Sequence, residues 1–319
     1  MFKFLGKGTW IIGAIISLFL MGCTTEPEKP LRVGTNLWPG YELLYLARDL
    51  DYFEKSPIRL VELSSATDVL RAFRNGILDV AALTLDETLT LLQTEPDLRV
   101  ILVLDISNGA DALLAKPSIK DIFALKGHRI AVENSAVGAI VMAHVLEVAR
   151  LSTEDVEITT ATVNNHYELY KQGKVDAVVT FDPMRTKLIN EGANVLFDSS
   201  QISGQIVDVL VTRKELLMHR SKTLQVLVDG QLKALNYLRS HPQEAIKRIA
   251  PRLAITQDEL AESYKGMVLP GLLANRKLVF GPTSPLQQTV KELVSMMLEK
   301  DLLYKEPQID ALISDAFIQ

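Results

Sequence analysis

The sequence predicts an α/β protein of two lobes, each a mostly parallel sheet with flanking helices, followed by a helical C-terminal tail. Three observations predict this fold class. From residue 31 onward, strand-like segments alternate with segments of helical apolar spacing, in two successive series. After about residue 220 the spacing is helical only. Several strand candidates are almost continuously apolar, as strands of a buried parallel sheet are.

The first series predicts four strands and three helices. The expected strands span residues 32–36, 58–63, 78–84 and 98–107. The expected helices span residues 41–50, 67–76 and 86–93. Thr67 is a candidate N-cap of the second helix, and Gly76 is a candidate C-terminal stop.

The second series repeats this alternation before the tail begins. Strands are expected at residues 128–134, 156–162, 175–181, 194–198 and 206–216. Helices are expected at residues 135–151, 165–174 and 183–192. The tail opens with a helix at 222–241 that Pro242 ends, and further helices follow it.

The N-terminus reads as a bacterial export signal. Lys3 and Lys7 precede an apolar run at residues 8–22, which is shorter than the ~20 residues that a membrane span prefers. The run ends in LMGC, which resembles a lipobox, so we expect a signal peptide at 1–22 and lipidation of Cys23. Residues 23–30 would form the lipidated tether, on the periplasmic side of a bacterial membrane. An uncleaved anchor is the alternative.

Composition excludes several classes of function. The chain of 319 residues carries a formal net charge of −5, which offers no basic face for nucleic acid. Its single cysteine permits neither an intrachain disulfide nor a cysteine-based metal cluster. No dinucleotide or P-loop motif is present, and we expect no cofactor and no metal.

Ligands of open α/β sheets bind at the carboxyl ends of the strands, in the loops that open the next helix. Four such loops follow predicted strands, at residues 38–41, 83–87, 133–138 and 180–184. The first of them, Trp-Pro-Gly-Tyr, supplies aromatic side chains of the kind that line ligand pockets.

Five stretches carry a resemblance to a known family. They are RVGTNLWPGYELLYLARDLDYF, LRAFRNGILDVAALT, LKGHRIAVENSAVGAIVMAHVLEVARL, KVDAVVTFDPMRTKL and SGQIVDVLVTRKEL. In this order they resemble extracytoplasmic substrate-binding proteins of the nitrate/sulfonate/taurine and thiamine-pyrimidine group. Asp51 departs from the family, which commonly has glycine there.

The resemblance implies a hinged, monomeric protein with a type II periplasmic-binding-protein-like fold and no catalytic activity. Its first lobe would combine residues 31–110 with 210–319, and its second would span 111–209. Its partners would be a small-molecule ligand, an ABC permease and the permease's ATPase.

Twelve residues are candidates for ligand binding. Trp38 and Tyr41 would form flat walls around a turn shaped by Pro39 and Gly40, unless that turn is purely structural. Asn134 and Ser135 stand before a helix whose free N–H groups would bind an anion, and ordinary capping is the alternative. The others are two hydroxyls and four carboxylates at strand ends or crossovers: Thr84, Thr180, Asp86, Asp111, Asp182 and Asp208.

The four carboxylates would favour a cationic or amine-bearing group. Asp208 is the strongest of them, because an unpaired carboxylate inside the apolar run IVDVLV is costly. An anion site beside an amine site would suit a taurine-like zwitterion, and an aminopyrimidine would use the carboxylates and Trp38. Three alternatives to the importer remain open at this point: a sensor that signals to a membrane kinase or cyclase, an enzyme on the same fold, and a structural lipoprotein.

Overall fold

The computed structural model describes residues 28–319, and residues 31–319 form one compact unit. The predicted signal peptide at 1–22 and the lipidation of Cys23 lie outside the described residues. Within the described part of the chain, every helix is too short or too polar to cross a membrane.

The first sheet has six strands, in the order β11-β4-β10-β3-β1-β2. They are β1 (Leu31–Thr35), β2 (Ile58–Glu62), β3 (Val80–Thr84), β4 (Leu98–Ser107), β10 (Val207–Arg213) and β11 (Met267–Val268). Strands β2, β1 and β3 run parallel, whereas β10 is antiparallel to both of its neighbours, β3 and β4. Strand β10, from later in the chain, therefore lies between β3 and β4 and separates β4 from the other strands of the N-terminal series.

The second sheet has five strands, in the order β7-β6-β8-β5-β9. They are β5 (Ala112–Ala115), β6 (Arg129–Val132), β7 (Glu157–Thr160), β8 (Ala177–Thr180) and β9 (Asn194–Asp198). Strands β7, β6 and β8 are parallel, and β5 runs antiparallel between β8 and β9. Helix α5 (Ala136–Ala149) covers one face, and α6 (Val163–Lys171) and α7 (Met184–Asn190) cover the other.

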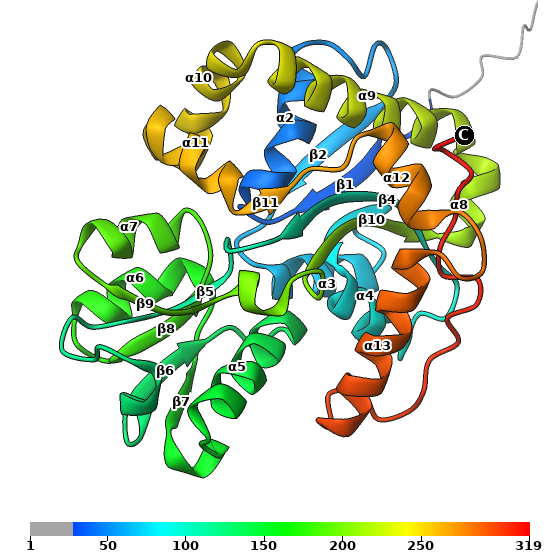
Figure 1. Cartoon of the computed structure of the whole chain (residues 1–319). Helices are drawn as coiled ribbons and strands as arrows, with labels where there is room; N and C mark the ends of the chain where they lie inside the picture. The colour runs from blue at the N-terminus through cyan, green and yellow to red at the C-terminus, as the bar shows by residue number, and fades with distance from the viewer. Residues whose placement is uncertain (1–27) are drawn as a thin grey trace, which may run out of the picture. The chain divides into compact units, whose positions relative to one another are not determined.

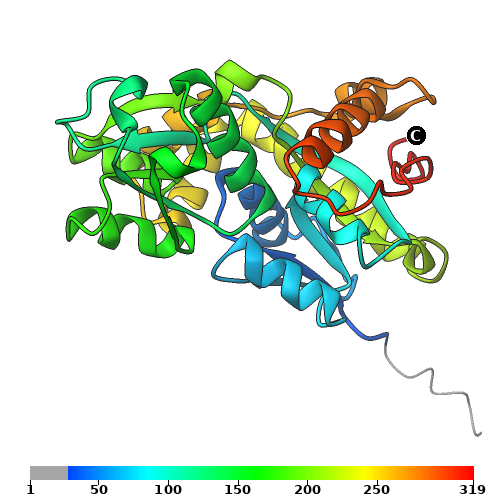
Figure 2. The ribbon, with the colours of Figure 1, turned by 90° about the horizontal axis from the view of Figure 1, so that it is seen from below.

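Helices cover both faces of the first sheet (Figure 1). One side carries α2 (Glu42–Asp49), α9 (Ser221–Ser240) and α10 (Pro242–Leu253), and the other carries α3 (Ala66–Arg74), α4 (Leu85–Leu92) and α13 (Pro285–Glu299). The remaining helices are α8 (Lys214–His219), α11 (Gln257–Lys265) and α12 (Leu272–Val279). Figure 2 shows the green helices of the second sheet at one end and α13 with the C-terminal segment at the other.

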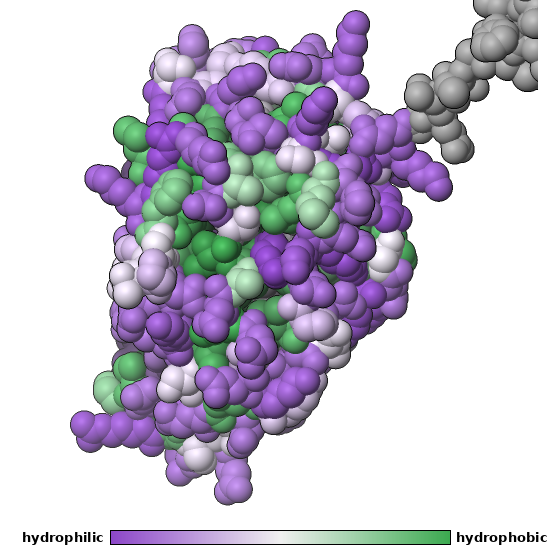
Figure 3. All heavy atoms as spheres, turned by 90° about the vertical axis from the view of Figure 1, so that its right-hand side faces the viewer, coloured by the Kyte–Doolittle hydropathy of each residue, from purple (hydrophilic) through white to green (hydrophobic). Residues whose placement is uncertain are grey.

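The apolar residues follow this division into sheets. One large core surrounds the first sheet and includes C-terminal residues such as Leu312 and Ile318, and two smaller cores lie on the two faces of the second sheet. The outer face in Figure 3 is mostly hydrophilic, with apolar side chains gathered near its middle.

Two short segments link the sheets. The chain leaves β4 at Ser107 and enters β5 at Ala112, and it returns between Ile202 and the start of β10 at Val207. The segments are hydrogen-bonded to each other, because Ser107 N donates to Ile206 O at 3.0 Å. The first segment is also bonded to the 3-10 turn Ser199–Ile202, where Ser199 Oγ accepts from Gly109 N at 2.7 Å. Paired linkers of this kind are suited to a hinge motion.

The α/β class and the alternation of elements are confirmed, with three corrections. The sheets are mixed instead of mostly parallel, because crossover strands β10 and β5 insert antiparallel to their neighbours. The strand predicted at 206–216 ends at Arg213, and α8 begins at the next residue, Lys214. Helix α3 is capped by Ser65, whose side chain accepts from Asp68 N, and not by Thr67. The predicted lobe boundaries at residues 110 and 210 stay a prediction.

Candidate functional site

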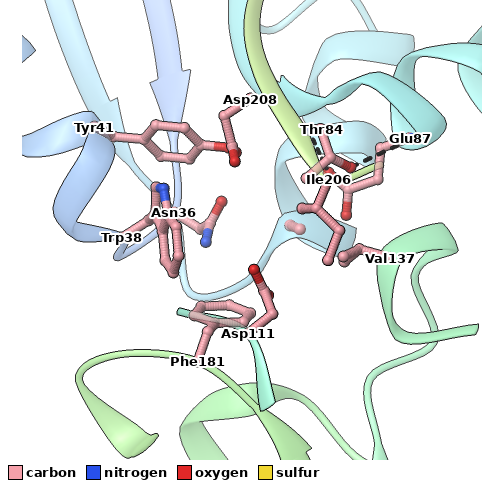
Figure 4. Close-up of a pocket in the computed structure, with 11 residues that line it drawn as sticks. Asn36, Trp38, Tyr41, Thr84, Glu87, Asp111, Val137, Phe181, Ile206 and Asp208 are labelled. Atoms are coloured by element: carbon pink, nitrogen blue, oxygen red, sulfur yellow. Dashed lines mark hydrogen bonds between the residues drawn. The ribbon is translucent and has the colours of Figure 1, made fainter. Parts of the chain in front are cut away.

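A small cavity of about 20 Å³ lies between the two sheets, beside the linkers. It is lined by Asn36, Trp38, Tyr41, Ala66, Thr84, Glu87, Asp111, Val137, Phe181, Ile206 and Asp208. Figure 4 shows the polar ends of several of these side chains directed into one shared space. A volume of this size holds about one water molecule, so an organic ligand would enter only when the sheets separate.

Hydrogen bonds at three places join the two sides of this cleft. Asn164 Nδ2 donates to Ser64 O at 2.6 Å, and Thr67 Oγ1 donates to Glu133 Oε1 at 3.1 Å. Asn190 Nδ2 donates to Glu259 Oε1 at 2.5 Å. The structure is therefore a closed arrangement, and opening it would break these hydrogen bonds and the contact between the Trp38 and Phe181 rings.

The Trp-Pro-Gly-Tyr turn follows β1 and forms one wall of the cavity. Trp38 is extended, Pro39 begins a single 3-10 turn (Pro39–Tyr41), and α2 continues from Glu42. The indole Nε1–H of Trp38 donates to Asp105 Oδ2 at 3.1 Å, and its ring meets Phe181 edge-on with 5.4 Å between centroids. The Tyr41 hydroxyl donates to Asp208 Oδ1. Both aromatic side chains of the turn are therefore fixed by hydrogen bonds from their polar groups to buried carboxyl groups.

Asp208 and Asp105 are directly opposite each other on neighbouring strands, β10 and β4. Both are buried, and a facing pair of like charges destabilises a sheet when both groups are ionised. Burial, followed by the charge of Asp105, raises the pKa of Asp208 well above its ordinary value. Burial also raises the pKa of Asp105 to about 7. The pair therefore holds protons at neutral pH that exposed carboxylates would release.

Glu87 enters the cavity from the first turn of α4. It forms a capping box with Thr84, in which Thr84 N donates to Glu87 Oε2 at 3.1 Å and Glu87 N donates to Thr84 Oγ1 at 3.4 Å. The second carboxylate oxygen, Oε1, is buried and has no hydrogen-bond partner among the residues that the structure describes. Burial, and then the charge of Asp86, raises the pKa of Glu87 to about 8.

Asp111 enters from the first linker, and Figure 4 shows its side chain beside the Phe181 ring. Its backbone N–H donates to Ser107 Oγ at 3.3 Å, which fixes the residue at the start of β5. Burial is the main cause that raises its pKa to about 6, and Asp182 adds to this effect. The positive charge of Arg185 acts in the opposite direction.

A second cavity of about 10 Å³ adjoins the first and shares Asp111, Val137 and Phe181 with it. Ser135 and Thr180 contribute to its walls. Ser135 Oγ accepts from Gly138 N at 3.3 Å, so it caps α5 in the ordinary way. The neighbouring Glu133 is buried in the same wall, which makes this helix start a poor site for an anion.

The twelve predicted site residues fall into three groups. Five line the first cavity: Trp38, Tyr41, Thr84, Asp111 and Asp208. Ser135 and Thr180 line the second, together with Asp111. The remaining five line neither cavity: Pro39, Gly40, Asp86, Asn134 and Asp182.

The residues of the last group have identifiable positions. Pro39 and Gly40 are buried behind Trp38, and Asp86 is buried beside Glu87 with both side-chain oxygens unpartnered within the described part of the chain. Asp182 Oδ1 accepts from Thr186 N at 2.9 Å, at the start of α7. Asn134 is exposed on a larger groove of about 570 Å³ beside α5, which also includes Lys300 and Leu302. Mainly apolar side chains line that groove, and the carboxylates do not converge there.

Sequence reasoning did not single out five polar or aromatic residues of the site: Asn36, Glu87, Asp105, Glu133 and Phe181. Glu87 and Phe181 belong to loops that were nominated, at 83–87 and 180–184. Asp105 lies inside the apolar run LRVILVLDIS, so the reasoning that identified Asp208 also applies to it. Asn36 carries no such signal.

Comparison with known proteins gives a family and a fold. The model of the NMT1/THI5-like family matches residues 38–245. A relative from Escherichia coli (strain K12), provisionally named an aliphatic sulfonates-binding protein, is 23% identical over 84% of this chain and 93% of its own length.

Two solved structures show the same fold. The alkanesulfonate-binding protein SsuA from Xanthomonas axonopodis pv. citri, bound to MOPS, superposes with a TM-score of 0.76 at 18% identity, over 90% of this chain and 99% of that one. A point mutant of DszB in complex with biphenyl-2-sulfinic acid superposes with a TM-score of 0.67 at 16% identity, over 90% and 98% of the two chains. The fold therefore occurs in a binding protein and in a protein crystallised with a sulfinic acid.

Proposed function

The chain belongs to the NMT1/THI5-like family, and from this premise we propose that it is the lipid-anchored solute-binding protein of an ABC importer. It would bind a small polar organic ligand in the cleft between the sheets and deliver it to a permease and its ATPase. The relatives named for sulfonate binding support this class of function. Cys23 would carry the lipid, which keeps the protein at the periplasmic side of the membrane.

One observation carries the proposal. Polar and aromatic side chains from the ends of β1, β3 and β8, from strand β10 and from the first linker converge on one closed cavity. Ligand pockets favour such a combination of apolar walls and a few placed polar groups. The linkers beside the cavity let ligand binding drive closure.

An enzyme on the same fold is the second candidate, because the DszB structure shares the architecture. The residues that line the two cavities include no cysteine, histidine or lysine, so the polar groups there are carboxyl groups, hydroxyls, the Asn36 amide and the Trp38 indole. Conversion of a bound compound to product, followed by mass spectrometry, would favour the enzyme. A sensor that signals to a membrane kinase or cyclase stays an alternative use of the same cleft.

Trp38 provides the test of the binding site. The full-length chain in mild detergent, carrying Trp10→Phe, has Trp38 as its only tryptophan. Titration with amines, aminopyrimidines, taurine, alkylsulfonates and nitrate should give a saturable change of Trp38 emission with one class, together with a rise in melting temperature. Leu273→Ala, at a site 71% exposed, is the matched control and should leave binding unchanged. A saturable ligand that raises the melting temperature without affecting Trp38 would place the site elsewhere.

The lipid anchor has its own test. Cys23→Ala should abolish incorporation of a labelled fatty acid and move the protein from the membrane fraction to the soluble fraction of a bacterial host. Cys23→Ser is the matched control and should behave in the same way, because a hydroxyl does not replace the thiol in lipidation. Label that persists in the alanine variant would refute the anchor.

A further inference from the structure

Three acidic side chains line the first cavity, and no cationic side chain lines it with them. Glu87, Asp111 and Asp208 line it, and none of its lining residues is lysine, arginine or histidine. Asp105 and Asp86 are buried close behind them. Arg185 is the cation that acts on Asp111, but it lines neither cavity. Carboxylates in such a low-dielectric site attract a cation strongly and repel an anion.

Glu87 supplies an independent indication of a ligand. Its side chain is 1% exposed, and Oε1 has no hydrogen-bond donor among the described residues. Figure 4 shows this oxygen turned toward the cavity, away from the two hydrogen bonds with Thr84. A buried, unpartnered acceptor is unfavourable and demands a donor. An N–H group of a ligand would provide it.

Aromatic rings complete the walls. Trp38, Tyr41 and Phe181 all line the cavity, with the Trp38 and Phe181 rings at 88° to each other. Ring faces bind desolvated cations through their quadrupole. Rings and carboxylates in one pocket therefore recognise the same class of ligand by two different interactions.

Resting on the proposed function, we infer that the ligand is a small organic cation with a protonated nitrogen, an ammonium or an amidinium, and not a sulfonate. Its N–H groups would donate to Glu87, Asp111 and Asp208, and its apolar part would contact Trp38 and Phe181. A quaternary ammonium would bind less tightly, because it has no N–H to give to Glu87 Oε1. A sulfonate, the kind of ligand in the names of the relatives, would be repelled in this cavity by the same three carboxylates.

The pH dependence of affinity separates these two classes. The titratable groups that face Glu87 and Asp208 are Tyr41, Asp86, Asp105, Asp111 and Glu133, and Arg185 acts on Asp111. The pKa values of Asp111, Asp105 and Glu87 are raised to about 6, 7 and 8. A cation lowers these values and expels protons, so its affinity rises from pH 6 to pH 8. A sulfonate would show the opposite slope.

Matched ligand pairs test the inference by calorimetry on the full-length chain. Methyl-, butyl- and benzylammonium and benzamidinium are compared with methane-, butane- and phenylmethanesulfonate, and tetramethylammonium tests the need for an N–H. We expect at least one protonated nitrogen compound to bind about tenfold or more tightly than its sulfonate partner and than tetramethylammonium. Glu87→Gln and Asp111→Asn should each weaken it by about tenfold or more. The control Glu147→Gln, at a side chain 71% exposed, should not.

The outcomes separate the inference from the function. A sulfonate that binds more tightly than every amine, with affinity kept or improved in Glu87→Gln, overturns the inference and leaves the solute-binding function intact. Binding by no compound of either class, with no change of melting temperature, counts against both. Melting curves of each variant check its folding, and Asp111→Asn serves if Glu87→Gln loses the α4 cap.

Discussion

Replacing Gly40 with alanine should abolish ligand binding and lower the free energy of unfolding by about 2–4 kcal/mol. A Cβ at this position would lie 1.9 Å from Asp105 Oδ2 and 2.6 Å from Trp38 Nε1. Both neighbours are buried, and the hydrogen bond between them passes directly beside Gly40. The methyl group would break that bond and push the indole into a cavity that has no room for it. Urea unfolding and the Trp38 titration measure the two effects.

Gly204→Ala is the matched control for this substitution. Gly204 has a φ of +82° and no atom within 4 Å of the position of an added Cβ, so alanine there meets backbone strain but no clash. We expect a cost of about 1 kcal/mol and unchanged binding. If Gly40→Ala were as stable as the control and bound ligand normally, the Trp38 wall would not depend on this turn.

The second large effect concerns pH. In the ligand-free protein, stability should fall as the pH rises from about 5 to 8. The folded-state pKa values of Asp105, Asp208 and Glu87 are raised above their unfolded values, so the folded protein holds more protons than the unfolded chain in this range. This contribution is fully present below the unfolded pKa values and is lost as the pH passes through the folded ones.

Asp208→Asn should remove much of this dependence. The amide oxygen still accepts from the Tyr41 hydroxyl, while the charge that faces Asp105 across the strands disappears. We expect a gain of about 2 kcal/mol at pH 8 and little change at pH 5, measured by urea unfolding at both values. The same variant should lose affinity for amines, as stabilising changes in binding sites often do. A variant less stable than the parent at pH 8 would show that Asp208 is paired with a cation there.

The elements of the fold were predictable because their signals are local. Apolar spacing and caps placed most helices and strands within a few residues, from β1 at 31–35 to α9 at 221–240. Strand β5 was missed because ALLA is four residues long and closely follows the predicted lobe boundary at residue 110. The antiparallel insertion of β10 was missed because strand direction within a sheet depends on pairing with distant segments.

The site was predictable as a set of loops more than as a set of side chains. The predicted strand ends identified the loops that form the site, and Asp208 was identified because its sequence neighbours are apolar. Choosing Glu87 over Asp86 requires the rotation of α4, which decides which of these two adjacent acids faces the cavity. Pairing Asp105 with Asp208 required knowledge that two segments far apart in the sequence form adjacent strands. No local signal carries that register.

The most direct test of the cationic site is the number of protons exchanged on binding. Calorimetry of the full-length chain with the tightest amine, in two buffers of different ionisation enthalpy at pH 7, measures it. We expect release of roughly half a proton or more, because the cation replaces protons on Glu87, Asp105 and Asp208. Net proton uptake on binding, or tight binding of a sulfonate with uptake, would contradict it.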